Sequence, residues 1–322
     1  MATQWLRRAW LAAAGASVLL LAACGGGGGD VDSNLAPSRV IVFGDAMADI
    51  GQNASGRRYT VNDSSVNNWT IVVANAFGYP LRRARSGGTS YAVGNARVAT
   101  MPGAGDDAAA TSVVRQVDAF EAADNFGGND LVLVNAGHSD IIVAARAAME
   151  GTQTRQQALD AVGAAGTALG KQVRRIVDAG AGFVAVVGPY NLGRSPWAKQ
   201  TNEEDLLEAL STAFTTKLKV EIADLNTTDS VHFLDFANQV NLFEGNPGNH
   251  GFGNVDSAVC RTRDAGEGIG TGTNQVNSSL CTSGTVLDVN YDGYLFADRI
   301  YLTPRSHRAL GEFAVEQLRN RW

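Results

Sequence analysis

The stretch VIVFGDAMADIGQN, residues 40–53, decides the fold of this chain. Its first half, Val40 to Phe43, is apolar and rich in β-branched residues, and it stops abruptly at Gly44 and Asp45. Such a run is typical of a strand that is buried on both faces of a parallel sheet. The residues after it would then lie at the carboxyl edge of the sheet, where open α/β sheets bind ligands. The sequence therefore places a candidate functional loop directly after its first strand.

Strands and helices alternate along the rest of the chain. Apolar runs predict strands at 130–136, 183–189 and 231–235, while helical spacing of apolar residues predicts helices at 69–77, 111–123, 155–179 and 203–225 and a closing helix that ends at Trp322. This order predicts an α/β fold, a three-layer α/β/α sandwich with a mostly parallel sheet. Residues 245–288 are rich in Gly, Asn and Ser, and we expect a long loop there that is functional or acts as a lid.

The amino-terminal residues resemble a bacterial lipoprotein signal. Arg7 and Arg8 precede an apolar region, residues 10–23, which the sequence Leu-Ala-Ala-Cys closes at Cys24. The resemblance implies a signal peptide over residues 1–24 with lipidation at Cys24; a plain secretory signal is the alternative. A transmembrane helix is disfavoured because a span needs roughly 20 apolar residues. Residues 25–37 read as a Gly-rich tether, so we expect a domain that is lipid-anchored in the bacterial cell envelope, at either membrane.

Composition limits the remaining possibilities. The chain has 322 residues, of which 45% are hydrophobic and 18% charged, enough for one globular domain over residues 38–322. A net charge of -6 argues against a nucleic-acid partner. Neither a phosphate-binding P-loop nor a dinucleotide fingerprint is present, and we expect no cofactor and no metal.

Two further cysteines, Cys260 and Cys281, lie in the long Gly-rich segment. A disulfide between them would close a loop of roughly 20 residues and stabilise the domain by about 3 kcal/mol. It would also fit an oxidising compartment. Two free thiols are the alternative, while a metal site is disfavoured because no clustered His or CxxC motif accompanies them.

Residues 43–51 resemble the first block of the SGNH (GDSL) hydrolases, a family of esterases and lipases. In that family Phe-Gly-Asp-Ser-Leu is followed by Asp-x-Gly-Asn, and the Ser is the nucleophile. Phe43, Asp45 and Asp49 match this pattern, but Ala46 occupies the nucleophile position. The resemblance implies the flavodoxin-like sandwich of SGNH hydrolases and a catalytic site that has lost its hydroxyl.

Residues 86–98, SGGTSYAVGNARV, resemble the family's second block, in which a backbone N–H at a Gly pair helps to bind the oxyanion. Gly94 is the first member of that pair and Asn95 replaces the second. Asn tolerates left-handed backbone better than most residues, so we expect the backbone path to survive. The Asn95 side chain is expected to intrude where a substrate would approach.

The last two blocks also depart from the family. Residues 137–140, GHSD, resemble Gly-x-Asn-Asp, with Ser139 where the family has the Asn that donates to the oxyanion. The final block, Phe-x-Asp-x-x-His-Pro-Thr, is matched at Asp298 and Thr303, but the base position is Tyr301 and Leu302 replaces the Pro. The triad and oxyanion positions are therefore Ala46, Asp298, Tyr301, Gly94 and Ser139.

These replacements predict a degenerate enzyme. Loss of the Ser or His of such a triad costs about a millionfold in turnover, roughly 8 kcal/mol. A Tyr with its ordinary pKa near 10 is a poor base at neutral pH. The hypothesis is a pseudoenzyme that binds an acyl chain, glycan or peptide in a retained cleft, or serves as a scaffold.

An active hydrolase of carboxylic esters is the alternative, with a rearranged site that uses water or an unassigned group such as His250, Ser90 or Ser139. The other histidines are interpreted as structural. His138, beside a helix start, reads as a solvated or capping residue and His232 as a satisfied residue within a strand. His307 is expected to face away from the site.

Overall fold

The computed structural model describes residues 33, 35–53 and 55–322. The predicted signal peptide, Cys24 and most of the predicted tether lie outside these residues. Ser33–Trp322 forms one compact unit. Within the described part of the chain, no helix has both the length and the apolarity that a membrane crossing requires.

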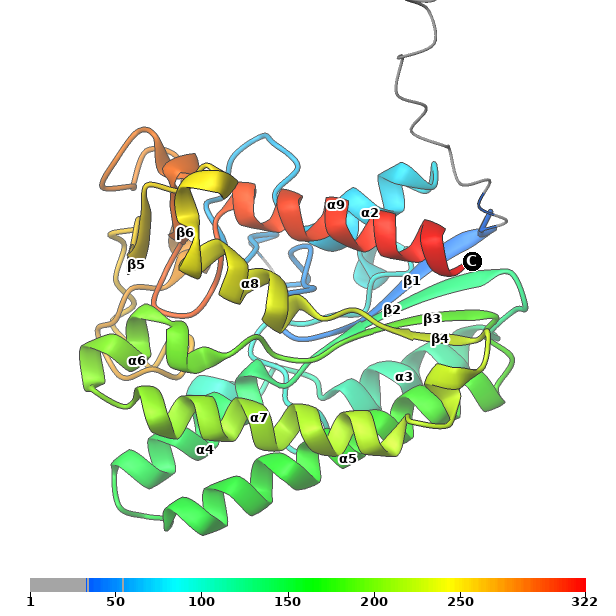
Figure 1. Ribbon diagram of the computed structural model, residues 1–322, viewed down its shortest axis with the longest axis horizontal. Coiled ribbons are helices and arrows are strands. Elements are labelled where there is room, and N and C mark those ends of the chain that lie inside the picture. Colours follow the sequence, from blue (N-terminus) through cyan, green and yellow to red (C-terminus); the bar gives the residue numbers. More distant parts are fainter. Residues whose placement is uncertain (1–32, 34, 54) are drawn as a thin grey trace, which may run out of the picture. The chain divides into compact units, whose positions relative to one another are not determined.

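A sheet of parallel strands forms the centre of the domain (Figure 1). Its strands are β1 (Arg39–Gly44), β2 (Asp130–Asn135), β3 (Phe183–Val187) and β4 (Val231–Phe233), and they lie side by side in this order. β1 pairs with β2 from Arg39 opposite Asp130 to Gly44 opposite Asn135, and every residue of β2 is buried. Burial on both faces explains why these strands are uninterrupted apolar runs rather than alternating ones.

The free edge of β1 carries one further short extended segment. The N–H of Val42 donates to the carbonyl of Thr89 at 3.0 Å, and the N–H of Tyr91 donates to the carbonyl of Val42 at 2.7 Å. Residues 89–91 thus run parallel to β1, which gives the spatial order 89–91, β1, β2, β3, β4. In chain order this is 2-1-3-4-5, the flavodoxin-like order, whose ligand sites lie beside β1 where the strand order reverses.

Helices cover both faces of this sheet, which confirms the three-layer α/β sandwich (Figure 1). One face carries α2 (Trp69–Ala76), α8 (Phe236–Gly245) and α9 (Pro304–Arg321); the other carries α3 (Val113–Ala123), α4 (His138–Met149), α5 (Arg155–Asp178) and α7 (Glu204–Glu221). Side-chain caps fix several starts: Thr154 and Gln157 form a capping box at α5, and Thr303 caps α9. The predicted helix 203–225 ends at Glu221, four residues early, and a 3-10 turn follows at Leu225–Thr227.

The long Gly-rich segment contains more structure than the sequence indicates. It holds β5 (Asn254–Ala258), which pairs in parallel with β6 (Tyr294–Phe296), and Cys260 is joined to Cys281 by a disulfide. The predicted disulfide is therefore confirmed, and the expectation of a segment without regular structure was wrong. The two cysteines belong to a small second core with Val61, Val259, Val286 and Ala297. A strand as short as β5 leaves too few residues for a visible alternation.

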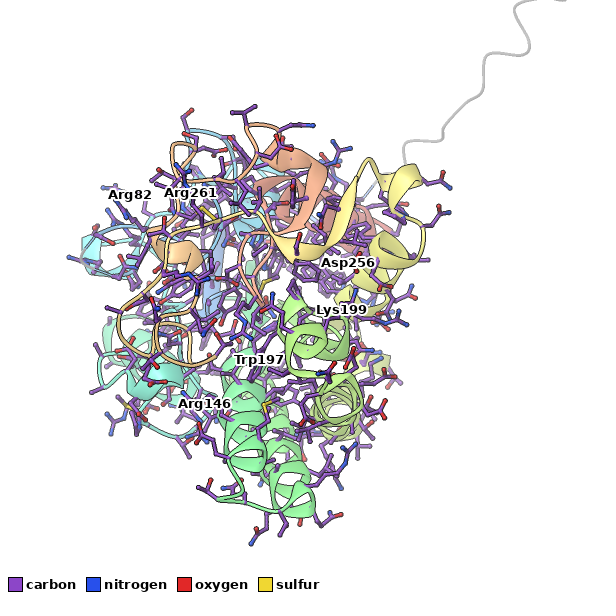
Figure 2. All side chains as sticks on the ribbon, turned by 90° about the vertical axis from the view of Figure 1, so that its left-hand side faces the viewer. Arg82, Arg146, Trp197, Lys199, Asp256 and Arg261 are labelled. Atoms are coloured by element: carbon purple, nitrogen blue, oxygen red, sulfur yellow. A yellow bond between two sulfur atoms is a disulfide. The ribbon has the colours of Figure 1, made fainter. Side chains whose placement is uncertain are left out.

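An ion pair fastens this segment to the main domain. Figure 2 looks onto the side where β5 and the short helix α6 (Pro196–Thr201) lie, and it shows Lys199 of α6 next to Asp256 of β5. The Lys199 Nζ lies 2.5 Å from Asp256 and 3.2 Å from Glu244 of α8. β5 thus contacts α6 through Lys199, which Glu244 of α8 also binds, in addition to pairing with β6.

A buried glutamine of α3 positions the end of β1. The sequence pattern did not predict this contact. The Gln116 Oε1 accepts from the N–H of Gly44 at 2.8 Å, and its Nε2 donates to the carbonyl of Gly44 at 2.9 Å. Gly44 is required here, because its φ is +154° and a Cβ atom would lie 2.1 Å from the carbonyl oxygen of Asn135. Gln116 therefore satisfies the backbone at the residue that begins the functional loop.

We expect Gln116→Leu to lower the free energy of unfolding by about 2 kcal/mol, because it leaves the buried N–H of Gly44 without a partner. Gln156→Leu, at an exposed position of α5, is the matched control and should change stability by less than about 0.5 kcal/mol. Urea unfolding of the two variants measures both values. Equal losses in the two variants would show that Gly44 does not need this side chain.

Candidate functional site

The structure brings the predicted site positions together at the carboxyl ends of β1 and β2. Ala46 follows β1 directly, and Ser139 lies in the first turn of α4, which follows β2. The ring of Tyr301 lies 6.3 Å from the ring of His138, the neighbour of Ser139. Tyr301 also lies 5.3 Å from the ring of Tyr59, measured between centroids. The blocks that resemble the SGNH hydrolases thus form one cluster, as the resemblance implies.

This cluster is closed to solvent. The exposed fractions of Ala46, Ser139, Tyr301 and Asp298 are 1%, 0%, 0% and 0%. Tyr59 fills the space beside Gly94 so tightly that a Cβ atom on Gly94 would lie 1.9 Å from its ring. The side chains at the catalytic positions therefore face protein and not an open cleft.

At the oxyanion position, Asn95 has a left-handed backbone and the N–H of Gly94 already has a hydrogen-bond acceptor. Asn95 has a φ of +62°, in the left-handed region that we expected Asn to tolerate. The N–H of Gly94, however, donates to the Asp49 Oδ2 at 2.9 Å. The Asn95 Nδ2 donates to the carbonyl of Gly268 in the long segment at 3.1 Å. An incoming oxyanion would have to compete with the Asp49 carboxylate for the Gly94 N–H.

Asp49 is the centre of the loop after β1. Its Oδ1 accepts from the N–H groups of Gly51 at 2.8 Å and Gln52 at 2.7 Å, in addition to the Gly94 contact. Complete burial raises the pKa of Asp49 to about 6, and the three N–H donors and the Arg58 charge act against this rise. At neutral pH the ionised carboxylate thus binds the backbone of two family blocks together.

Asp298 binds backbone groups and does not orient the Tyr301 ring. Its Oδ1 accepts from the N–H groups of Ile300 at 2.8 Å and Tyr301 at 2.6 Å, and its Oδ2 accepts from the N–H of Ser278 at 2.9 Å. Asp298 therefore closes the turn before Tyr301 and fastens the disulfide-bearing segment to it.

Tyr301 is unsuited to the role of a base. Burial, with a smaller effect of the Asp45 and Asp298 charges, raises its pKa well above 10, and the nearby Ser139 hydroxyl offsets only part of this. The Tyr301 hydroxyl has no hydrogen-bond partner among the described residues. It therefore stays protonated at neutral pH.

His138 forms a buried pair with Asp45 that sequence reasoning missed. Its Nδ1 lies 3.2 Å from the Asp45 Oδ2, and its backbone N–H donates to the same oxygen at 3.0 Å. The side chain is 1% exposed, so the interpretation of His138 as a solvated residue was wrong. The available signal was its place between Gly137 and Ser139 in a family block. The pairing could not be read from the sequence, because Asp45 is 93 residues away.

The Asp45–His138 pair has the chemical form of a base with its orienting carboxylate. When Nδ1 carries the proton and donates to Asp45, Nε2 presents a lone pair. Within the described residues this Nε2 has no hydrogen-bond partner, nor have the hydroxyls of Ser139 and Tyr301. Three buried polar atoms without hydrogen-bond partners thus occur in one cluster, which makes it a candidate functional site.

The other imidazoles and the serine considered as alternatives lie in different surroundings. His307 is buried in α9, and burial lowers its pKa to about 3. His232 is half-buried on β4 and His250 packs against Phe243 at 5.0 Å between centroids. Ser90 is buried on the edge segment beside β1, and its hydroxyl has no partner among the described residues. Of the three alternatives His250, Ser90 and Ser139, only Ser139 adjoins the Asp45–His138 pair.

The described part of the chain contains no cluster of potential metal ligands. No group of three or more His, Cys, Asp or Glu side chains is placed there to hold a metal ion.

Comparison with known proteins gives one family match. A model of the GDSL-like lipase/acylhydrolase family matches residues 40–314. No curated protein matches the chain.

Several solved structures resemble the chain. A member of the lipolytic G-D-S-L family from Veillonella parvula has a TM-score of 0.43 and 11% identity over 86% of this chain and 96% of its own. A carbohydrate acetylesterase from Sinorhizobium meliloti has a TM-score of 0.44 and 13% identity over 87% and 97%. An aryl esterase of M. smegmatis has a TM-score of 0.41 and 15% identity over 88% and 99%. Similarities at this level carry no information about activity.

His307 should make stability depend on pH. Its pKa is about 3 in the folded protein and about 6.5 in the unfolded chain. The unfolded chain therefore binds the proton first, so the contribution of His307 is complete above pH 6.5 and is lost as the pH falls towards 3. At pH 5 this loss amounts to about 2 kcal/mol.

Urea unfolding at pH 7.5 and pH 5 measures this effect. His307→Gln should reduce the difference in stability between the two pH values, whereas the control His250→Gln should leave it as in the parent protein. The same pH dependence in both variants and in the parent would contradict the assignment to His307.

Proposed function

The chain belongs to the GDSL-like lipase/acylhydrolase family. Because its catalytic positions depart from the family pattern, we propose that it is a binding or scaffolding protein of the bacterial envelope that lacks hydrolase activity. One observation carries the proposal: the nucleophile position holds the methyl group of Ala46, 1% exposed, in a cluster closed by Tyr59 and Tyr301. Acyl transfer in this family pattern needs a hydroxyl, a base and a free oxyanion donor together. At Ala46, Tyr301 and Gly94, each of the three is missing or engaged elsewhere.

The envelope location rests on two features of the chain. Residues 1–24 carry the pattern of a lipoprotein signal with Cys24 at its end. The Cys260–Cys281 disulfide suits an oxidising compartment. The membrane partner is then the lipid bilayer that holds the anchor. The ligand is an acyl chain, a glycan or a peptide. Because the cluster at the family's catalytic positions is closed, the expectation of a retained cleft there was wrong, and the ligand would bind outside this cluster.

Ester hydrolysis is the second candidate, and the Asp45–His138 pair favours it. In this mechanism the His138 Nε2 takes the proton of Ser139 or of a water molecule while that oxygen attacks the ester carbonyl. The same nitrogen then returns the proton to the leaving alkoxide. If Ser139 attacks, the product is an acyl ester of Ser139. The His138 Nε2 must next take a proton from water, which attacks this ester and releases the acid, and the proton returns to the Ser139 oxygen. A substrate could reach these atoms only if Tyr59 and Tyr301 moved, because every group involved is at most 1% exposed.

Hydrolysis of p-nitrophenyl acetate by the purified unit Ser33–Trp322 distinguishes the two candidates. We expect turnover equal to that of buffer. The control variant is His138→Gln; Asp298→Ala is unsuitable, since Asp298 holds three backbone N–H groups and its loss would disturb the whole cluster. Turnover that disappears in His138→Gln would contradict the binding proposal, as would labelling of Ser139 by a fluorophosphonate.

Restoring the family residues should not restore the activity. The triple variant Ala46→Ser, Ser139→Asn, Tyr301→His supplies the missing groups, but Tyr59 still packs on Gly94 and Asp49 still occupies its N–H. We therefore expect its p-nitrophenyl acetate turnover to stay within tenfold of buffer. A larger gain would show that the replaced side chains themselves, and not Tyr59 and Asp49, close the site.

A further inference from the structure

Positive charge is concentrated in one part of an otherwise acidic chain. Residues 51–100 contain six arginines and a single acidic residue, Asp63, although the whole chain has a net charge of -6. Two of the arginines are adjacent at Arg57 and Arg58, and three more lie within Arg82–Arg85. The fold brings these two groups to opposite sides of the same loop.

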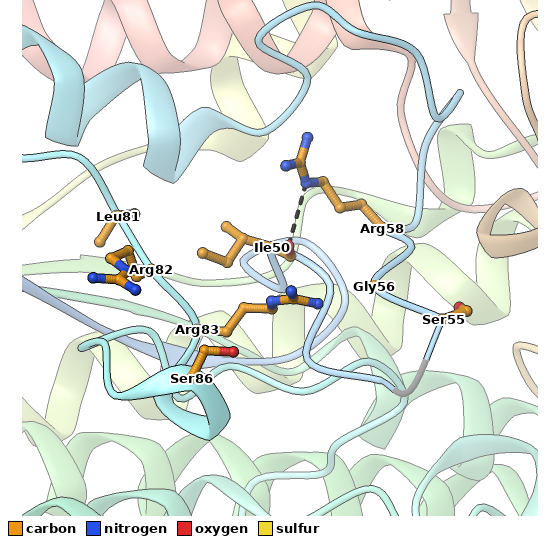
Figure 3. A pocket seen from close by; sticks show the side chains of 8 residues that line it. All are labelled: Ile50, Ser55, Gly56, Arg58, Leu81, Arg82, Arg83 and Ser86. Atoms are coloured by element: carbon orange, nitrogen blue, oxygen red, sulfur yellow. Dashed lines mark hydrogen bonds between the residues drawn. The ribbon is translucent and has the colours of Figure 1, made fainter.

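The two groups line a pocket of about 730 Å³ beside the loop that follows β1. Arg58 comes from one side of it, and Leu81, Arg82, Arg83 and Ser86 come from the other. Figure 3 shows the three guanidinium groups on different sides of the Ile50 side chain. We call this cavity the arginine pocket; it contains none of the family's catalytic positions.

The backbone of the loop holds some of these arginines in place. The Arg58 Nε donates to the carbonyl of Ile50 at 3.3 Å, and the Arg83 Nη1 donates to the carbonyl of Gly51 at 3.0 Å. A guanidinium has five N–H donors, so each of these arginines keeps donors for a ligand. The pocket thus presents oriented cations and not only mobile surface charges.

The arginines of the pocket form no direct ion pair with a carboxylate of the described residues. Arg58, Arg82 and Arg83 take part in none of the ion pairs formed there. Burial lowers the pKa of Arg58, and the charge of Arg83 lowers it further, while Asp49 and Asp63 act in the opposite direction. The Asp49 carboxylate is already occupied by three backbone N–H groups. Three like charges that form no direct ion pair, with Asp49 and Asp63 acting on Arg58 only from beyond ion-pair distance, favour the binding of an anion.

We propose that the arginine pocket binds a phosphate group, carried by a small phosphorylated molecule or by a phospholipid headgroup. Guanidinium forks match phosphate oxygens in pairs, and three of them suit an anion with more than one charge. The volume exceeds that of phosphate alone, and Leu81 and Ile50 provide apolar surface for an organic part of the ligand. This inference does not depend on whether the chain hydrolyses esters.

Arg82 provides the test, because its role in the fold is smallest. It is exposed, and its side chain forms no hydrogen bond to the described residues, unlike those of Arg58 and Arg83. Arg115, an exposed residue of α3 outside the pocket, is the matched control because its loss changes the net charge equally. Arg82→Gln and Arg115→Gln should both keep the thermal midpoint of the parent.

The experiment is calorimetric titration of the full chain in a non-ionic detergent at constant ionic strength. One arm uses inorganic phosphate and the other uses dihexanoyl phosphatidic acid. We expect binding in at least one arm, at least tenfold weaker in Arg82→Gln and within twofold of the parent in Arg115→Gln. Arg82→Lys, which keeps the charge and loses the fork, should fall between Arg82→Gln and the parent.

Each outcome decides the proposal. Binding of phosphatidic acid alone supports a headgroup, and binding of inorganic phosphate supports a soluble phosphorylated ligand. The absence of heat in both arms overturns the proposal. Equal weakening in Arg82→Gln and Arg115→Gln also overturns it, because binding would then reflect net charge only. An Arg82→Gln variant with the same affinity as the parent overturns the proposal as well.

Discussion

The Asp45 carboxylate holds together the loops that follow β1 and β2, and the rest of the site depends on it. Its Oδ2 accepts from the backbone N–H of His138 and faces the imidazole, while its Oδ1 accepts from the N–H of Met47. The N–H of Asp45 still donates to the carbonyl of Asn135 at 3.0 Å, but beyond this bond the two loops diverge at the point where the strand order reverses. Because the backbone groups of the two loops are buried, they need side-chain hydrogen-bond partners. Asp49, Asp140, Asp298 and Gln116 serve the same purpose in neighbouring turns.

This use of carboxylates separates the residues that support the fold from those at the family's other catalytic positions. The residues that match the family, Asp45, Asp49 and Asp298, all accept backbone N–H groups. The side chains that depart from it, those of Ala46, Ser139 and Tyr301, accept no backbone N–H among the described residues. Replacement of the second group therefore costs the scaffold little, whereas loss of the first would leave buried donors without partners. The aromatic pair Tyr59 and Tyr301 then fills the volume.

The loop after β1 has two different sides. Its amide groups face Asp49 inside the protein, and its carbonyls at Ile50 and Gly51 face arginines that border the arginine pocket. The interior side is closed and the outer side is open and positively charged. A ligand of the arginine pocket would therefore contact the outer side of this loop. The inner side of the same loop carries Ala46, at the nucleophile position of the family.

The sequence by itself determined the four strands of the central sheet, the three-layer arrangement and the identities at the five family positions, and it indicated Cys260 and Cys281 as a candidate disulfide pair. These follow from local patterns: the apolar runs that become β1 and β2 are read from neighbouring residues, and Ala46 is identified within its own block. Only the tertiary structure decided that the cluster is closed, that His138 pairs with Asp45 and that Gln116 holds Gly44. It also decided that Arg58 and Arg82 border one cavity. The physical reason is distance along the chain: Asp45 and His138 are 93 residues apart and Gln116 and Gly44 are 72 apart, so no local pattern encodes these contacts.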